Sequence, residues 1–252
     1  MADQPDLTAV PVAGARPDTY EIQGRTVTLP MHIARAQAGG AIFSASAAEV
    51  TTDLPFGLEP VLLRPGRTAA ALLMVDYQDN PLGDYDEGVV ATPVVRSGHG
   101  GGLTPLREVL AGRVGLFVHH MPVSQAFTRE AGEVIWGYPK TLDTLEFRRR
   151  DRRAGLRWAT DEGEVLQLTV PRGGRLSLPK APGMTWTFHE GQLLRTPLQV
   201  QLGGARFGLG GASLRLGTHP IADQLRRWQL SRRALATAWV DHAELWFDPA
   251  QI

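Results

Sequence analysis

The residue with the most distinctive chemistry in this sequence is Lys140, one of only two lysines in the chain. Of the 26 basic residues, 24 are arginine, and the other lysine is Lys180. Arginine cannot be deprotonated in a protein, whereas a buried lysine can lose its proton. A position that keeps lysine in so arginine-rich a chain is therefore a candidate for a task that needs a neutral amine.

The residues just before Lys140 favour an inward-pointing side chain. Gly137 is a natural C-terminal stop for the preceding helical pattern, and Pro139 pushes Tyr138 into an extended conformation. Trp136 and Tyr138 place two aromatic side chains within four residues of the lysine. This arrangement suits a lysine directed into an apolar cavity, and the alternative is a lysine at a surface loop.

Three other patterns carry weaker signals. Residues 97–102 contain an HGGG string, but the chain lacks the G-x-S-x-G elbow of an esterase, so a surface connection is expected. His119 and His120 are adjacent in a strand pattern, which directs them to opposite faces and excludes a shared metal. The basic run at 148–153 predicts a solvated hairpin tip or a subunit contact.

The composition is that of an ordinary globular protein. The 252 residues are 43% hydrophobic and 21% charged, with 26 acidic against 26 basic residues and no cysteine. The balanced charge argues against binding to nucleic acid or an anionic membrane, and the lack of cysteine excludes disulfides and thiolate metal sites. The longest apolar run, residues 69–75, is too short to span a membrane, and no signal peptide is visible. We therefore expect a cytoplasmic location.

The elements that must position Lys140 are mostly strands. Helical patterns are few and lie at 44–53, 103–110, 124–135 and 220–230. Residues 1–18 predict a flexible tail that precedes a single domain at 19–252. The expected fold class is α+β and β-dominated, with antiparallel sheets closing on a central cavity and a few short helices. Short apolar or alternating runs predict strands at 19–33, 69–77, 88–95, 114–123, 140–150, 154–160, 164–170, 192–202, 205–210, 212–219 and 236–247.

The segment E-V-I-W-G-Y-P-K-T, residues 133–141, resembles the signature of the acetoacetate decarboxylase family, in which a lysine after aromatic-Pro forms the substrate imine. Further segments resemble the family in the same order. They are an early strand with a site arginine at 20–25, a P-x-x-L-E segment at 54–59, a Y-x-E segment with a site glutamate at 83–88, the strand–helix–signature block at 116–140, and a closing strand at 237–247.

The resemblance implies a cone-like β-barrel, homo-oligomers, and no metal or organic cofactor, because the lysine itself supplies the electron sink. It implies that Lys140 is the nucleophile. An ordinary lysine is neutral in only about one molecule in 2,000 at pH 7, so the family's chemistry requires burial or a neighbouring positive charge. Acetoacetate decarboxylase is itself the standard example of such activation.

The resemblance also implies roles for residues around the lysine. Glu87 is expected to orient the substrate or relay protons, and Arg25 to position Glu87 or a carboxylate. The alternative is that Glu87 and Arg25 only form a salt bridge between strands. Trp136, Tyr138 and Tyr85 are expected to contact the substrate.

This sequence departs from the family pattern at three places. Thr141 stands where a second lysine is usual. Val134 stands where a glutamate is usual, and Glu133 is displaced by one residue, which turns it by about 100° on a helix. A carboxylate usual in an earlier strand falls at Ala71 or Leu72. The expected site is therefore more apolar and less charged than the family pattern.

The leading functional hypothesis is a lysine Schiff-base enzyme that decarboxylates a small oxo acid, for example a β-keto acid such as acetoacetate. A second hypothesis keeps the imine but gives an aldolase-dehydratase or a biosynthetic enzyme, which Thr141 and Val134 favour. A third is a small-molecule binding protein without turnover. The expected partner is a small-molecule oxo acid, with neither nucleic acid nor membrane.

Overall fold

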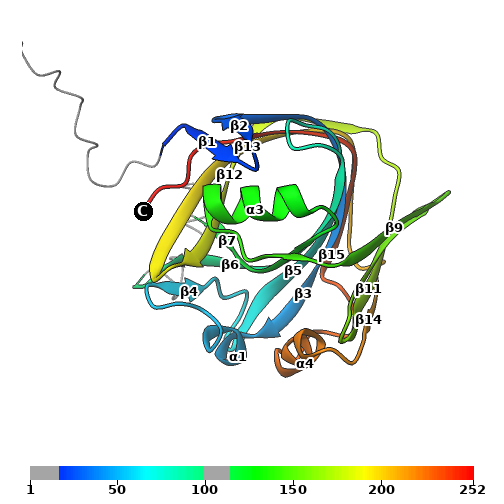
Figure 1. The fold of residues 1–252 in the computed structure, drawn as a ribbon. Coiled ribbons are helices and arrows are strands. Elements are labelled where there is room, and N and C mark those ends of the chain that lie inside the picture. Colours follow the sequence, from blue (N-terminus) through cyan, green and yellow to red (C-terminus); the bar gives the residue numbers. More distant parts are fainter. Residues whose placement is uncertain (1–16, 99–113) are drawn as a thin grey trace, which may run out of the picture.

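A closed β-barrel of seven strands forms the centre of the molecule. The computed structural model describes residues 17–98 and 114–252. Neighbouring barrel strands are antiparallel, except that β12 and β7 run parallel, and the pairing of β6 with β7 closes the ring. The expected β-dominated barrel is thus confirmed (Figure 1). Around the barrel the order is β6 (Tyr85–Arg96), β5 (Arg67–Asp79), β3 (Met31–Ser46), β15 (Ala236–Phe247), β13 (Gln192–Gly208), β12 (Leu176–His189) and β7 (Gly115–Val123).

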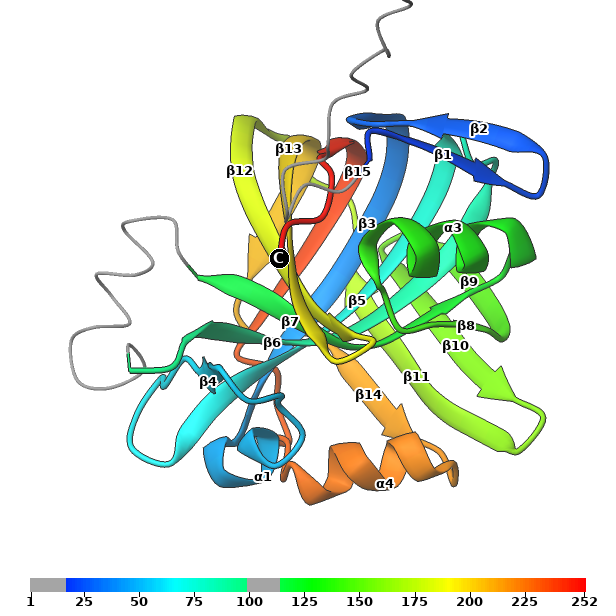
Figure 2. The same ribbon diagram turned by 60° about the vertical axis from the view of Figure 1, so that its left-hand side comes forward.

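Short elements complete the barrel. Strand β4 (Leu58–Pro60) pairs with β6, and β8 (Lys140–Leu142) runs parallel to β7. The hairpin of β1 (Thr19–Ile22) and β2 (Arg25–Thr28) forms a two-stranded sheet that is not hydrogen-bonded into the barrel sheet. The helices of the described chain are α1 (Ala47–Thr51), α3 (Ala126–Trp136) and α4 (Pro220–Arg227). Helix α3 lies across the space that the barrel strands enclose, and α1 and α4 lie near the other end (Figures 1 and 2).

A second sheet covers one side of the barrel. It contains β9 (Thr144–Arg150), β10 (Arg153–Thr160), β11 (Gly163–Pro171) and β14 (Ser213–Leu216), in the order β14-β11-β10-β9 (Figure 2). A core of buried side chains from both sheets, including Trp158, Leu168 and Trp239, joins them. The interior of the barrel has a separate cluster of buried residues, to which the site belongs.

The alternation of side chains on β5 explains why the centre of this strand, residues 69–75, is apolar at every position. Leu73, Val75 and Tyr77 line the barrel interior, whereas Leu72 and Met74 belong to the core shared with the second sheet. Successive residues of a strand point to opposite faces, so a strand buried on both faces needs apolar residues at every position.

Strand β3 was not predicted over most of its length, and its sequence explains why. Alanine and glycine, which rarely favour strands, fill its centre. A Cβ at Gly39 would lie 2.8 Å from side-chain atoms of Met74 and Trp239, so the strand needs glycine for close packing. The strand also continues through Ser46, and the helix expected at 44–53 is shortened to Ala47–Thr51. Strand β12 was missed as well.

Two expectations about residues outside the main elements can be compared with the structure. The basic run at 148–153 forms the exposed tip of the β9–β10 hairpin, as predicted. The expected tail at 1–18 lies outside the described residues up to position 16, and so do the predicted helix at 103–110 and most of the HGGG string at 97–102.

The prediction that His119 and His120 face opposite sides is wrong. Val90 of β6 pairs with His120 while Ala91 pairs with Val118, so His119 is an extra residue in the β7 ladder. Such a bulge shifts the alternation of side chains. Both histidines line the same hollow on the outer side of the barrel, and neither lines the barrel interior.

Candidate active site

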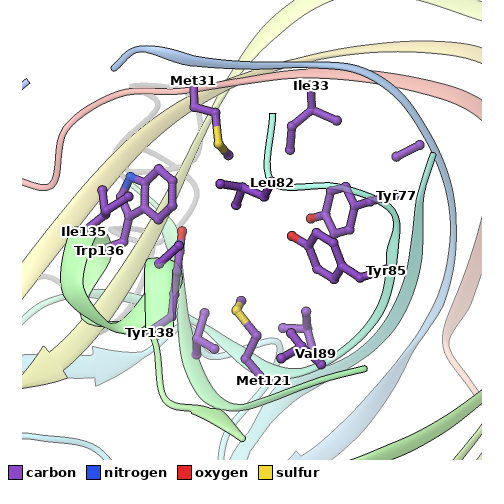
Figure 3. Packing of buried hydrophobic residues seen from close by; sticks show 14 of the residues in the cluster. Met31, Ile33, Tyr77, Leu82, Tyr85, Val89, Met121, Ile135, Trp136 and Tyr138 are labelled. Carbon is purple, nitrogen blue, oxygen red and sulfur yellow. The ribbon is translucent and has the colours of Figure 1, made fainter. Parts of the chain in front are cut away.

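The barrel interior contains a cavity of about 320 Å³ next to Lys140. Figure 3 shows its walls: Tyr77 and Tyr85 lie together on one side, Trp136 and Tyr138 lie on the other, and Leu82 lies between them. Glu87 and Lys140 are the charged residues that line it in the described chain. The cavity therefore offers one charged pair in an otherwise apolar chamber.

The end of α3 and the start of β8 position the lysine. Gly137 adopts a left-handed conformation with φ of 64°, and its N–H donates to the Glu133 carbonyl at 2.9 Å. A glycine at this position ends the helix without strain. Three residues later the chain enters β8, where Lys140 pairs with Met121 of β7. The Lys140 side chain is 5% exposed, which confirms the expected inward direction.

Lys140 and Glu87 form a buried ion pair. The Lys140 Nζ donates to the Glu87 Oε2 at 2.7 Å, and each side chain is 5% exposed. The Tyr77 hydroxyl donates to the other carboxylate oxygen, Oε1, at 3.2 Å. The ammonium also lies 5.2 Å from the centre of the Tyr85 ring. Each carboxylate oxygen thus has a donor, and the lysine has a proton acceptor within direct reach.

Gly132 gives the lysine its path past helix α3. A Cβ at this glycine would lie 2.5 Å from the Cδ and Cε atoms of Lys140 and 3.2 Å from its Nζ. Only a residue without a side chain therefore leaves the lysine in its present position. Gly132 was not recognised from the sequence, because a glycine inside a helical pattern carries no signal of what packs against it.

Three buried tyrosines surround the pair. The rings of Tyr77 and Tyr85 stack with centres 4.5 Å apart. Burial, and then the negative charge of Glu87, raise the pKa of both phenols well above the usual range. Burial also raises the pKa of Tyr138, whose hydroxyl forms a hydrogen bond with the Thr185 Oγ1 at 2.7 Å. All three hydroxyls therefore remain protonated at neutral pH and can donate hydrogen bonds.

Trp136 is fixed in the cavity wall by its backbone and its ring. Its Nε1 donates to the Asp248 carbonyl at 2.9 Å, and its own carbonyl accepts from the Thr187 hydroxyl at 2.9 Å. These bonds tie the end of α3 to β12 and to the C-terminal segment. The expected residues Trp136, Tyr138 and Tyr85 all line the cavity.

Arg25 lies elsewhere, and the expected contact with Glu87 is not found between these described residues. The exposed guanidinium of Arg25 donates to the Pro81 carbonyl at 3.1 Å and lies 4.1 Å from the centre of the Phe127 ring. The alternative, a salt bridge between Arg25 and Glu87, is not found either, and the partner of Glu87 is Lys140. The family pattern implied site roles for both Arg25 and Glu87. The sequence did not show that Glu87 lines the cavity and Arg25 does not.

The positions that depart from the family pattern add no charge to the cavity. Thr141 is exposed and donates to the Asp143 carboxylate at 2.8 Å. Glu133 and Val134 are exposed on α3. On β5 the cavity is lined by Leu73, Val75 and Tyr77, and not by Ala71 or Leu72. The cavity lining is therefore apolar at these positions, as the sequence predicts.

Tyr77 and Leu82 are site residues that the sequence did not single out. Tyr77 is the last residue of a predicted strand, and its partner across the ladder is Tyr85. The alternation from Leu73 to Tyr77 could have placed it on the inner face, but the register against β6 is not visible in the sequence. Leu82 lies in the turn between the two strands and is 1% exposed.

Other site types are not indicated by the described residues. In residues 17–98 and 114–252, no group of three or more His, Cys, Asp or Glu side chains is placed to hold a metal ion. The same part of the chain has no helix of the length and apolarity needed to cross a membrane.

The fold and the site define a class of protein: a closed β-barrel whose apolar interior holds one lysine–glutamate pair. The family model described as acetoacetate decarboxylase (ADC) matches residues 19–250. Because this match spans almost the whole sequence, the chain belongs to the acetoacetate decarboxylase family. A search of curated proteins finds no match.

Solved structures share the same fold at low sequence identity. Acetoacetate decarboxylase from Legionella pneumophila has a TM-score of 0.66 at 15% identity, covering 97% of this chain and 92% of that chain. The enduracididine biosynthesis enzyme MppR has a TM-score of 0.62 at 14% identity, with coverages of 90% and 89%. An acetoacetate decarboxylase-like enzyme from Sphingomonas wittichii RW1 has a TM-score of 0.56 at 15% identity, with coverages of 90% and 94%.

Proposed function

We propose that this protein is a lysine Schiff-base lyase that decarboxylates a β-keto acid. The observation that carries the proposal is the Lys140 Nζ, buried in an apolar cavity and 2.7 Å from the Glu87 carboxylate. Burial disfavours the charged amine, and an adjacent carboxylate can take its proton. Family members include decarboxylases, and the barrel is common to them.

The reaction begins with a proton transfer from the Lys140 ammonium to Glu87, which leaves a neutral amine and a neutral carboxyl group. The amine adds to the ketone carbonyl, and Glu87 protonates the resulting hydroxyl, which departs as water. The product of this step is a protonated imine, with Glu87 again ionised. Nucleophilic catalysis by lysine requires this deprotonated starting state.

The imine then serves as the electron sink. The bond to the carboxylate breaks, carbon dioxide departs, and the electron pair moves to the nitrogen to give an enamine. Glu87 takes one proton from solvent and delivers it to carbon, which restores the imine. Addition of water and collapse of the carbinolamine release the ketone and return the Lys140–Glu87 pair. One proton is consumed in each turnover.

The tyrosines support this cycle by their hydrogen bonds and their bulk. The Tyr77 hydroxyl holds one oxygen of Glu87 while the other oxygen faces the amine. Tyr85, Trp136 and Tyr138 contact the substrate in this proposal, because they form the cavity wall beside the pair.

Borohydride trapping tests the proposed imine. Incubation with a β-keto acid and borohydride should inactivate the protein, and Lys140→Ala should abolish both turnover and trapping. Lys180→Ala is the matched control, because Lys180 is the only other lysine and is exposed. This variant should retain both properties. Failure of trapping with a panel of β-keto acids at neutral and alkaline pH would refute the proposal.

A condensation reaction is the second candidate, because the cavity also has room for a second small reactant beside the lysine. MppR, which shares the fold, has been crystallised with pyruvate and with the condensation product of pyruvate and imidazole 4-carboxaldehyde. Pyruvate with an aldehyde would then give a condensation product without release of carbon dioxide.

If Lys140→Ala leaves ligand affinity almost unchanged and no imine is trapped, the protein is a binding protein without turnover.

A further inference from the structure

We infer that the substrate of the Lys140 site carries a large apolar group on its ketone, as in a medium-chain or aryl β-keto acid, rather than the methyl group of acetoacetate. The inference rests on the proposed function and adds the substrate class. It follows from where the polar groups of the cavity lie, how far the apolar walls extend, and which charges are missing.

The polar groups of the cavity gather around the lysine. Next to Lys140 lie Tyr77 of β5 and Tyr85 and Glu87 of β6. The hydrogen-bonded pair of Tyr138 and Thr185 lies across from them. The rest of the lining is apolar. It includes Leu73, Val89, Ala91, Leu116 and Val118.

The apolar lining extends well beyond the reacting centre. Glu87, Val89 and Ala91 alternate along β6 and all line the cavity. At a rise of about 3.3 Å per residue, Ala91 lies roughly 13 Å along the strand from Glu87. Leu73 of β5 pairs with Val89, and Val118 of β7 pairs with Ala91, so apolar side chains flank this path. We call this part of the cavity, lined by Leu73, Val89, Ala91, Val118 and Leu116, the apolar arm.

The charges of the cavity permit a carboxylate at the lysine but not in the apolar arm. Among the described residues, no arginine lines the cavity, and Arg25 binds the Pro81 carbonyl outside it. Lys140 is the only cation that lines the cavity in the described part of the chain, so a substrate carboxylate must lie beside the imine. A second charge or a hydroxyl in the apolar arm would be buried without a partner, which is strongly unfavourable. The remainder of the substrate must therefore be uncharged and apolar.

The cavity volume agrees with this requirement. About 320 Å³ lies at the lower end of the range of roughly 300–1,000 Å³ that is typical of sites for drug-sized ligands. Acetoacetate, with four carbon atoms, would fill only the region around the charged pair. An alkyl or phenyl group would in addition cover the apolar arm.

A series of substrates tests the inference. The purified protein is assayed with 3-oxobutanoate, 3-oxohexanoate, 3-oxooctanoate and 3-oxo-3-phenylpropanoate, and carbon dioxide release is measured. Each buried methylene should raise kcat/KM about fourfold, so 3-oxohexanoate should exceed 3-oxobutanoate by about 16-fold. A flat or falling series would overturn the inference.

Variants of the apolar arm make the test specific. Ala91→Leu should lower kcat/KM for 3-oxooctanoate at least tenfold more than for 3-oxobutanoate. Leu73→Ala, which enlarges the apolar arm, should shift the preference to longer chains, and it replaces Ala91→Leu as the test if that variant does not fold. Ala48→Leu makes the same change at an exposed position of α1 and should leave the chain-length preference unchanged. Equal effects of Ala91→Leu on short and long substrates would contradict the inference.

Borohydride trapping distinguishes a failure of the proposed function from a failure of the inferred substrate class. If no acid of any length is trapped on the protein, the proposed function itself fails. If all acids are trapped but turnover does not depend on chain length, the imine stands and the apolar substrate class is wrong.

Discussion

The ion pair of Lys140 and Glu87 determines what this cavity can do. Both side chains are 5% exposed, so each has lost most of its hydration. Such a pair is stable only because each charge compensates the other and Tyr77 adds a hydrogen bond. A proton that moves along this 2.7 Å contact converts the pair into a neutral amine and a neutral acid. In the proposed mechanism, that step does not use a second lysine at Thr141.

Glu87→Gln tests the proton transfer at the residue scale. The amide keeps the shape of the carboxylate but cannot accept the lysine proton or deliver one to the enamine. We expect kcat to fall by about 100-fold or more, because general acid–base catalysis contributes roughly 10²–10⁴-fold. Pre-steady-state measurement of carbon dioxide release checks this. A kcat within threefold of that of the unmodified protein would exclude Glu87 as the proton carrier.

Gly132→Ala tests the position of the lysine. The added Cβ would overlap the Lys140 Cδ and Cε at 2.5 Å and push the amine away from Glu87. A displacement of about 1 Å at a reacting group can cost on the order of 100-fold in rate, so we expect kcat to fall 10- to 100-fold. The thermal midpoint should be unchanged or higher, because alanine favours a helix over glycine.

The control for Gly132→Ala is Glu133→Ala, at the exposed neighbouring position of the same helix. It should leave kcat near that of the unmodified protein. A Gly132→Ala variant with full activity would show that the lysine can reach the substrate by another path.

At the scale of elements, the junction of α3, β8 and β7 positions the site, and much of it can be read from the sequence. The glycine stop at Gly137 and the extended Tyr138 before Pro139 follow from local conformational rules. The bulge at His119 does not, because it depends on how β6 aligns with β7. Strand β3 also escaped prediction, because Gly39 and its alanine neighbours are explained only by the side chains packed against them.

The bulged His119 predicts a pH dependence of stability. Burial, and then the charge of His120, lower the pKa of His119 to about 3. An unfolded histidine has a pKa of about 6.5, so the unfolded state binds one more proton between these values. The contribution of His119 to the free energy of unfolding is therefore complete above about pH 6.5. It is lost as the pH falls toward 3, by up to roughly 1.4 kcal/mol per pH unit.

Urea denaturation between pH 4 and pH 7 measures this effect. His119→Gln should reduce the slope of unfolding free energy against pH, because glutamine does not titrate. An identical slope in the two proteins would mean that His119 is protonated in the folded state or that other groups dominate.

At the scale of the whole molecule, two cores share the barrel wall. The inner core holds the site, and the outer core joins the barrel to the second sheet. The sequence predicts a β-dominated chain with a cavity, but not the closure of β6 on β7 or the parallel contact of β12 and β7. These pairings join segments far apart in the chain, and no local pattern specifies them. For the same reason, Lys140 and Glu87 were identified from local segments, whereas Tyr77 was not.

Leu168→Ala tests the separation of the two cores. Leu168 is 2% exposed in the outer core, and its truncation should lower the free energy of unfolding by about 2–5 kcal/mol. Denaturant unfolding checks the loss. The kcat measured well below the melting temperature should remain close to that of the unmodified protein, and a parallel loss of kcat would show that the outer core also sets the geometry of Lys140.

Peptide mapping of the borohydride-reduced protein tests the central claim most directly. After incubation with 3-oxo-3-phenylpropanoate and reduction, mass spectrometry should find one adduct per chain, on the peptide that contains Lys140 and not on the one that contains Lys180. The adduct should have the mass of the decarboxylated ketone joined through a secondary amine. An unmodified Lys140 peptide from a protein that has consumed the substrate would contradict the account.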